Sequence, residues 1–117
     1  MITIKEQSRD FSAVEQYLMT LDNGIISMKD VTDNTSIPVT GYIIFEDEKE
    51  NGDVNEILSI ITDTKEVYSC QSATFKRTVK DIAGIMKGEP FSVIKVSGKT
   101  KAGRDFINCT LDVNSVK

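Results

Sequence analysis

The sequence predicts a mainly β domain in which one helix separates the third and fourth of five strands. Its 117 residues suffice for one hydrophobic core without metal or disulfide crosslinks. Apolar residues make up 39% and charged residues 27%, as in globular proteins. Short apolar and β-branched segments alternate with turn signals, and only one segment changes clearly to helical spacing. We therefore expect a single soluble domain dominated by strands.

The N-terminal region allows two interpretations. Residues 1–9 are expected to form a loose tail. In Asp10–Leu21 the apolar residues recur at helical spacing, and Ser12 followed by Glu15 matches a capping box. Residues 17–20 would also suit an extended segment. We expect a short helix here, with the extended conformation as the alternative.

Three strands are expected next, at residues 36–46, 54–62 and 66–70. In the first of them, Ile43 and Phe45 would lie on one face and Tyr42 and Ile44 on the other. The polar segment between the first two strands contains Asn51-Gly52, a strong turn signal.

The clearest helix is predicted at residues 72–87. Ser72 can cap its first turn, Gly88 follows its last, and four apolar residues recur every three or four positions: Phe75, Val79, Ile82 and Met86. Two strands follow, at 91–97 and 104–113, joined by a glycine-containing turn.

Three strands, a helix and two strands is the order of the OB-fold, a five-stranded Greek-key barrel. We assign the barrel to residues 37–113 and an N-terminal extension to residues 1–36 of one domain. OB-folds bind oligonucleotides or oligosaccharides with the face of strands 2 and 3 and with the loops between strands 1 and 2 and between strands 4 and 5.

Charge is distributed unevenly along the chain, whose net charge is −4. Residues 1–64 hold 4 basic and 13 acidic residues, a net charge of −9, whereas residues 65–104 hold 9 basic and 3 acidic residues, a net charge of +6. This asymmetry has two interpretations: a polyanion-binding face on an otherwise acidic protein, or a mixed surface on which the two halves neutralise each other.

The turn between the last two strands carries Lys99, Lys101 and Arg104 with two glycines and no acid. Such cations can follow a phosphate backbone, lysine as a point charge and arginine as a bidentate donor. Lys95 on the fourth strand and Arg77 on the helix complete the candidate phosphate-binding residues. The alternative is a solvated turn and a solvated helix face.

Three aromatic residues are candidates for stacking on bases. Strand alternation places Phe106 on the polar face of the last strand, where an exposed ring can stack on any base. Tyr42 and Tyr68 are similar candidates on the first and third strands. The alternative is that these rings pack in or around the core.

Several classes of function are disfavoured. The chain has no histidine, so histidine-based acid–base catalysis and the usual zinc sites are not expected, and we predict no cofactor and no metal. Cys70 and Cys109 have no CxxC spacing and are expected to be reduced core residues. No apolar run approaches a membrane span and the N-terminus lacks signal-peptide features, so we expect a cytoplasmic protein that is not an enzyme.

Four stretches carry a family resemblance: Gly41 to Asp47, Glu56 to Ile61, Val67 to Ser69 with Ser72 to Phe75, and Ser97 to Ile107. Together they resemble the small single-stranded DNA-binding proteins of protein-primed tailed bacteriophages of Gram-positive hosts. The most specific stretch reads Gly-Lys-Thr-Lys-Ala-Gly-Arg-Asp-Phe, where relatives commonly show Gly-(Thr/Lys)-(Ser/Thr)-Lys-x-Gly-(Arg/Asn)-x-(Phe/Tyr). The acidic first half of the chain is not explained by this pattern.

The resemblance implies a non-enzymatic protein that coats displaced single strands during phage DNA replication, in the host cytoplasm. Lys101 and Arg104 would hold phosphates, and Phe106 with one or more tyrosines would stack on bases. Single-stranded DNA is then the expected partner, with replication proteins as further partners and no membrane. The alternative is an acidic protein-binding module without DNA affinity, which would use residues 46–56 to occupy the nucleic-acid site of another protein.

Overall fold

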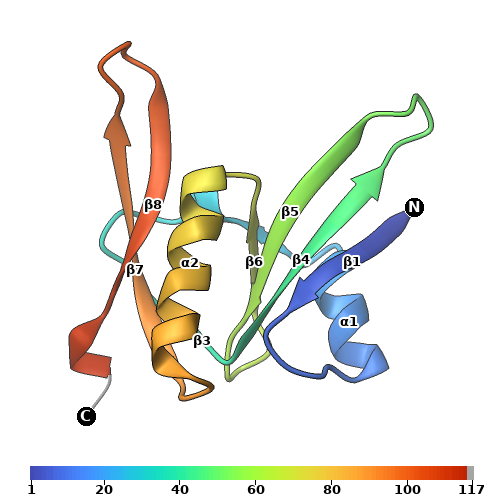
Figure 1. The fold of residues 1–117 in the computed structure, drawn as a ribbon, viewed down its shortest axis with the longest axis horizontal. Coiled ribbons are helices and arrows are strands. Elements are labelled where there is room, and N and C mark those ends of the chain that lie inside the picture. Colours follow the sequence, from blue (N-terminus) through green and yellow to red (C-terminus); the bar gives the residue numbers. More distant parts are fainter. Residues whose placement is uncertain (116–117) are drawn as a thin grey trace.

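Two β-sheets and two α-helices make up the computed structural model, which describes residues 1–115 (Figure 1). The first sheet has the strand order β1-β4-β5-β6-β2 and the second the order β3-β7-β8. The strands are β1 (Ile2–Gln7), β2 (Ile26–Ser27), β3 (Ser36–Val39), β4 (Gly41–Glu48), β5 (Val54–Ile61), β6 (Val67–Cys70), β7 (Phe91–Lys99) and β8 (Asp105–Leu111). The helices are α1 (Ala13–Thr20) and α2 (Ala73–Met86), with 3-10 turns η1 (Met28–Asp30) and η2 (Val113–Ser115). The predicted mainly β class is confirmed.

The first predicted strand is divided between the two sheets. Residues 36–39 pair with β7 as β3, and from Gly41 onwards the chain pairs with β5 as β4. The chain bends at Thr40, whose N–H and hydroxyl both donate to the carbonyl of Ile61 at 3.0 Å. The ring of Phe11 packs against Gly41 so closely that a Cβ there would lie 2.7 Å from its Cζ. This bend couples the two sheets.

The sheets do not close into the barrel that the sequence led us to expect. In the expected five-stranded barrel, β6 would use its free edge to pair with β8. That edge instead pairs in parallel with β2, through Ile26 opposite Tyr68 and Ser27 opposite Ser69. At β8, the hydroxyl of Ser72 at the start of α2 donates to the carbonyl of Ile107 at 3.2 Å. The seam between β6 and β8 is therefore open, because a strand from the N-terminal region and α2 occupy the two edges.

The expectation of a loose tail at residues 1–9 is wrong. Residues 2–7 form β1, which pairs antiparallel with β4 from Ile2 opposite Asp47 to Gln7 opposite Ile43. Most of β1 is exposed, and its apolar alternation is limited to Ile2 and Ile4, too short to distinguish a strand from a tail. The N-terminal extension is thus an integral part of the fold, and its Met28 is fully buried.

Two apolar clusters form the core, one on each face of the first sheet. The first lies between the sheets and under α2 and includes Met28, Ile37, Val39, Ile44, Leu58, Ile60, Phe75, Val79, Phe91 and Val93. The second lies under α1 and contains Phe11, Met19, Ile43, Phe45, Ile61 and Val67. The predicted alternation along β4 is confirmed, and both of its faces are packed.

The two cysteines are free and buried, as predicted. Burial raises the pKa of the Cys70 thiol to about 11 and that of the Cys109 thiol to about 12. Because the thiolate is the reactive form, both residues are apolar core components in the folded protein.

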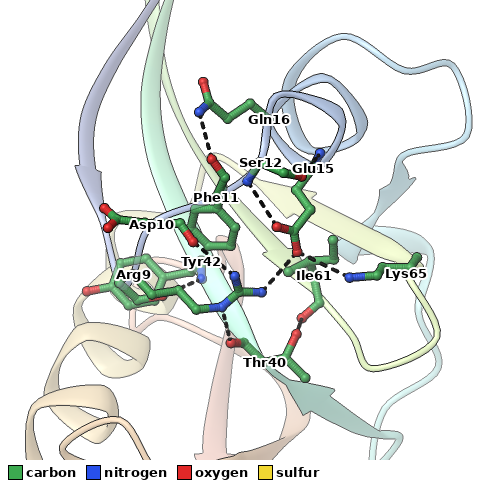
Figure 2. A network of polar contacts seen from close by, with 11 residues as sticks. Arg9, Asp10, Phe11, Ser12, Glu15, Gln16, Thr40, Tyr42, Ile61 and Lys65 are labelled. Atoms are coloured by element: carbon green, nitrogen blue, oxygen red, sulfur yellow. Dashed lines mark hydrogen bonds and ion pairs between the residues drawn. The ribbon is translucent and has the colours of Figure 1, made fainter.

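Helix α1 begins with the predicted capping box: the Ser12 hydroxyl accepts from the Glu15 N–H, and the Glu15 carboxylate accepts from the Ser12 N–H, both at 3.1 Å. The same carboxylate bonds Arg9 at 3.1 Å and Lys65 at 3.2 Å (Figure 2). Hydrogen bonds from Arg9, Ser12 and Lys65 lower the pKa of Glu15 to about 2. Glu15 therefore joins α1, the preceding loop and the turn between β5 and β6.

This network predicts a specific acid sensitivity. Because the folded-state pKa of Glu15 lies below the ordinary value of 4.5, its ionised form stabilises the fold above pH 4.5. That stabilisation is lost as the pH falls from 4.5 towards about 2. We expect Glu15→Gln to lower the melting temperature at pH 7 and to differ less and less from the native protein as the pH falls through this range.

Thermal unfolding followed by circular dichroism between pH 7 and pH 2.5 measures this difference. Glu50→Gln removes an exposed carboxylate from the loop between β4 and β5, outside the network, and serves as the matched control. A melting-temperature difference between Glu15→Gln and the native protein that stays constant across the pH range would contradict the role assigned to Glu15.

Candidate nucleic-acid interface

The predicted basic turn lies at the tip of the long hairpin β7–β8, which projects from the body of the molecule (Figure 1). The hairpin is paired up to Lys99 opposite Asp105. Its tip is closed by bonds from the N–H of Thr100 to the Arg104 carbonyl and from the N–H of Gly103 to the Thr100 carbonyl, both at 2.9 Å. Gly103 has φ +81°, a conformation that glycine adopts without strain. The turn is an ordered structure that holds its cations clear of the core.

Two of the three predicted cations at this tip have no acidic partner among the residues that the structure describes. Lys101 and Arg104 are exposed and make no ion pair within residues 1–115. Lys99 pairs with Asp105 at 3.4 Å, and both side chains are largely exposed. An exposed pair of this kind is worth little in water, so Asp105 partly neutralises Lys99 without locking it. Lys101 and Arg104 are therefore the cations best placed to bind phosphate.

Phe106 lies at the base of this tip with its ring on the backbone of Gly98, the residue opposite it on β7. A Cβ at Gly98 would lie 2.7 Å from Cζ of the ring and 2.9 Å from Cε1. The Phe106 side chain is 37% exposed. Strand alternation places it on the opposite face of β8 from the buried Cys109, as the sequence predicts. Because Gly98 has no side chain, the partly exposed Phe106 ring packs directly against its backbone.

A groove of about 800 Å³ begins beside this ring. It runs between the hairpin, η1 and the junction of β6 with α2, and its lining includes Lys29, Gln71, Ser72, Ser97, Phe106 and Ile107. It therefore lies at the open seam between β6 and β8. Ser72 also caps α2 by accepting from the Phe75 N–H at 3.1 Å, so the start of the helix borders the groove.

Lys29 is a candidate that the sequence analysis missed. Its side chain is exposed in η1, lines the groove and makes no ion pair within the described part of the chain. Lys29 lies in the acidic half of the sequence with no other cation near it, so no local pattern identified it. Only the fold brings it to the same groove as Phe106.

Lys95, a predicted phosphate-binding residue, is buried, with 3% of its surface exposed. Its ammonium group donates to the Val31 carbonyl at 2.7 Å and pairs with Asp33 at 3.3 Å. A hydrogen bond from Ser97 and the contact with Lys95 lower the pKa of Asp33. Lys95 lines the groove, but its ammonium group is already bound and fastens the segment after η1 to the hairpin, so we do not count it among the phosphate-binding residues.

Arg77 is exposed on α2, but it borders a different groove of about 480 Å³, between α2 and the first sheet. The neighbouring helix cations are paired with acids from the first half of the chain: Lys76 with Glu56 at 3.0 Å and Lys80 with Glu6 at 3.1 Å. On this side of the molecule, the acidic and basic halves neutralise each other, the second of the two interpretations given above. The structure does not bring Arg77 together with the hairpin tip.

The two candidate tyrosines are also separate from the groove. Tyr42 and Tyr68 both lie opposite Ile60 on β5, so they share the inner face of the first sheet. Both rings pack against the first core cluster, and burial is the main cause that raises the pKa of each hydroxyl. Their positions match the alternative given above, in which the tyrosines belong largely to the core.

The sheet face that an OB-fold would use for binding is covered. The outer face of β4, β5 and β6 packs under Phe11 and Met19 of the N-terminal region. The hairpin β4–β5 projects on the other side of α2 from β7–β8 (Figure 1). Its strands and loop carry six acids: Glu46, Asp47, Glu48, Glu50, Asp53 and Glu56. Three of them are paired, Glu46 with Lys5, Asp47 with the N-terminal amine and Glu56 with Lys76. This leaves β7–β8 and its groove as the surface best suited to a polyanion.

Within residues 1–115, no group of three or more histidine, cysteine or acidic residues is arranged to hold a metal ion. Among the helices of the same residues, none has the length and apolar character needed to cross a membrane. Comparisons of the chain with protein-family models, curated proteins and solved structures give no match.

Proposed function

We propose that this protein binds single-stranded DNA through the hairpin β7–β8 and the groove beside it. The observation that carries the proposal is the combination, on one hairpin, of two cations that make no ion pair within the described residues and an exposed aromatic ring packed against glycine. Lys101 and Arg104 would contact phosphates, and Phe106 would stack on a base at the entrance of the groove. Lys29 on the opposite side of the groove would contact a neighbouring phosphate.

This mode of binding predicts weak dependence on base sequence. Backbone charge and stacking do not read the edges of the bases. A single strand is preferred to a duplex, because Phe106 needs the face of an unstacked base. The net charge of −4 does not oppose the proposal, since binding responds to the local potential at the hairpin.

We propose further that the fold is an OB-type barrel with an open seam. The bent pair β3–β4 would be its first strand, followed by β5, β6, α2, β7 and β8 in the expected order. Together with the resemblance of the hairpin sequence to phage single-stranded DNA-binding proteins, this supports a role in coating displaced strands during phage DNA replication.

Fluorescence anisotropy of a labelled oligo-dT and of its duplex counterpart tests the function directly. We expect tight binding to the single strand at low salt, weaker binding to the duplex and a steep loss of affinity as salt is raised, because phosphate contacts release counterions. Absence of binding to oligo-dT at low salt would overturn the proposal.

A second function is favoured by the acidic hairpin β4–β5. Its carboxylates could mimic a nucleic-acid backbone and occupy the basic cleft of another protein. This alternative requires no DNA affinity, so the anisotropy experiment separates the two functions.

A further inference from the structure

Helix α1 exposes an apolar stripe that nothing in the described fold covers. Val14, Tyr17 and Leu21 are spaced by three and four residues, so they lie along one face of the helical segment. Their exposed fractions are 67%, 52% and 62%. The buried side of α1 is different: Met19 packs into the second core cluster, with Leu18 beside it. The apolar stripe, defined as these three exposed residues, therefore makes no contribution to the core.

The helix that carries the stripe is held rigidly. Its N-terminus is fixed by the capping box, and Glu15 ties it to Arg9 and Lys65 (Figure 2). Near its C-terminus, Thr20 donates its hydroxyl to the Gln16 carbonyl at 2.7 Å, and the N–H of Leu21 donates to the Tyr17 carbonyl at 3.0 Å. The stripe is therefore preorganised, which reduces the entropy lost when a partner binds.

Two carboxylates flank the stripe. Residues 10–28 contain no lysine or arginine, and Asp10 before the helix and Asp22 after it make no ion pair within residues 1–115. Glu15 is already paired with Arg9 and Lys65, so it adds no free negative charge. An apolar surface with an acidic rim selects a partner whose own apolar surface is flanked by cations.

A second copy of this chain fits poorly on the stripe. Antiparallel packing of two α1 helices would place Asp10 of one copy near Asp22 of the other, and these like charges repel. The helix has 8 residues, which is about 12 Å in length. Such a contact buries far less than the roughly 1,200 Å² of a stable dimer. The small area instead suits a transient contact with one short segment.

We propose that the apolar stripe of α1 binds a basic amphipathic helix of a partner protein. The partner would present apolar side chains spaced by three, four and seven residues, with lysine or arginine on either side. The site lies on the covered face of the first sheet, away from the hairpin β7–β8 (Figure 1). The protein could thus hold DNA and this partner simultaneously, and neither proposal depends on the other.

The test uses the full chain labelled with ¹⁵N and a synthetic amphipathic peptide of leucine and lysine, about five turns long. We expect weak binding, with amide shifts centred on residues 13–21. Val14→Ser/Leu21→Ser should weaken peptide binding by at least about tenfold, because the variant lacks two apolar side chains that the bound peptide would bury. The same variant should retain its affinity for oligo-dT. Both positions are exposed, so we expect the variant to fold.

Two controls make the test specific. Ile85→Ser removes an exposed apolar side chain from α2 and should leave peptide binding unchanged. A peptide with glutamate in place of every lysine should not bind. Shifts centred on the acidic hairpin β4–β5, equal binding of the glutamate peptide, or a dimer in sedimentation that Val14→Ser/Leu21→Ser dissociates would each overturn the proposal.

Discussion

Replacing Phe106 by alanine is expected to weaken binding to oligo-dT by about 1 to 3 kcal/mol, the usual contribution of one stacked base. This corresponds to roughly 5-fold to 150-fold in the dissociation constant. Stacking releases no counterions, so the slope of log affinity against log salt should stay the same. The melting temperature should change little, because the ring lies on Gly98 at the surface and not in either core cluster.

Gly98→Ala tests the packing of the Phe106 ring against the Gly98 backbone without removing the ring. The added Cβ would lie 2.7 Å from Cζ of Phe106, so the ring must move. We expect an intermediate loss of affinity, again at constant salt slope. Tyr17→Ala, which removes an exposed aromatic ring from α1, is the matched control and should bind oligo-dT normally. If Phe106→Ala kept full affinity and only its melting temperature fell, the ring would be a packing element and not a stacking platform.

Replacing both Lys101 and Arg104 by alanine is expected to lower affinity for all single-stranded sequences and to reduce the salt dependence. Each lost phosphate contact should reduce the slope by about 0.7, so the double variant should lose about 1.4 in total. Lys99 remains in place because Asp105 already partly neutralises it. Anisotropy titrations at several salt concentrations measure both the affinity and the slope.

Lys49→Ala/Lys87→Ala is the matched control for this variant. It removes the same number of exposed cations, neither of which makes an ion pair within the described residues, from positions outside the hairpin β7–β8 and its groove. Its slope should therefore remain close to that of the native protein. An unchanged slope in Lys101→Ala/Arg104→Ala, or an equal reduction in the control, would remove the hairpin tip from the proposed interface.

Local patterns in the sequence predicted the features that depend on near neighbours. The helix at residues 72–87 corresponds to α2 because its apolar spacing and its Ser72 cap lie within one segment. The capping box of α1 and the exposure of Phe106 on β8 follow from spacing along the chain for the same reason. The basic turn was recognisable because its cations are adjacent in sequence and no acid separates them.

Tertiary structure decided which of these residues share a surface. Lys95 lies in a basic segment of the sequence. In the structure its ammonium group is bound by the Val31 carbonyl and the Asp33 carboxylate, which are more than sixty residues away in sequence. Lys29 had no local signal, yet it lines the groove beside Phe106.

Pairing between distant strands decided how the two sheets are built. The edge of β6 is taken by β2, a two-residue strand with too little pattern to be predicted, and the seam next to β8 stays open. The exposed strand β1 escaped prediction for a similar reason. Strand propensity and alternation report whether a segment suits a sheet. They do not report which edge it joins, because the free energy of that choice comes from contacts between residues far apart in the chain.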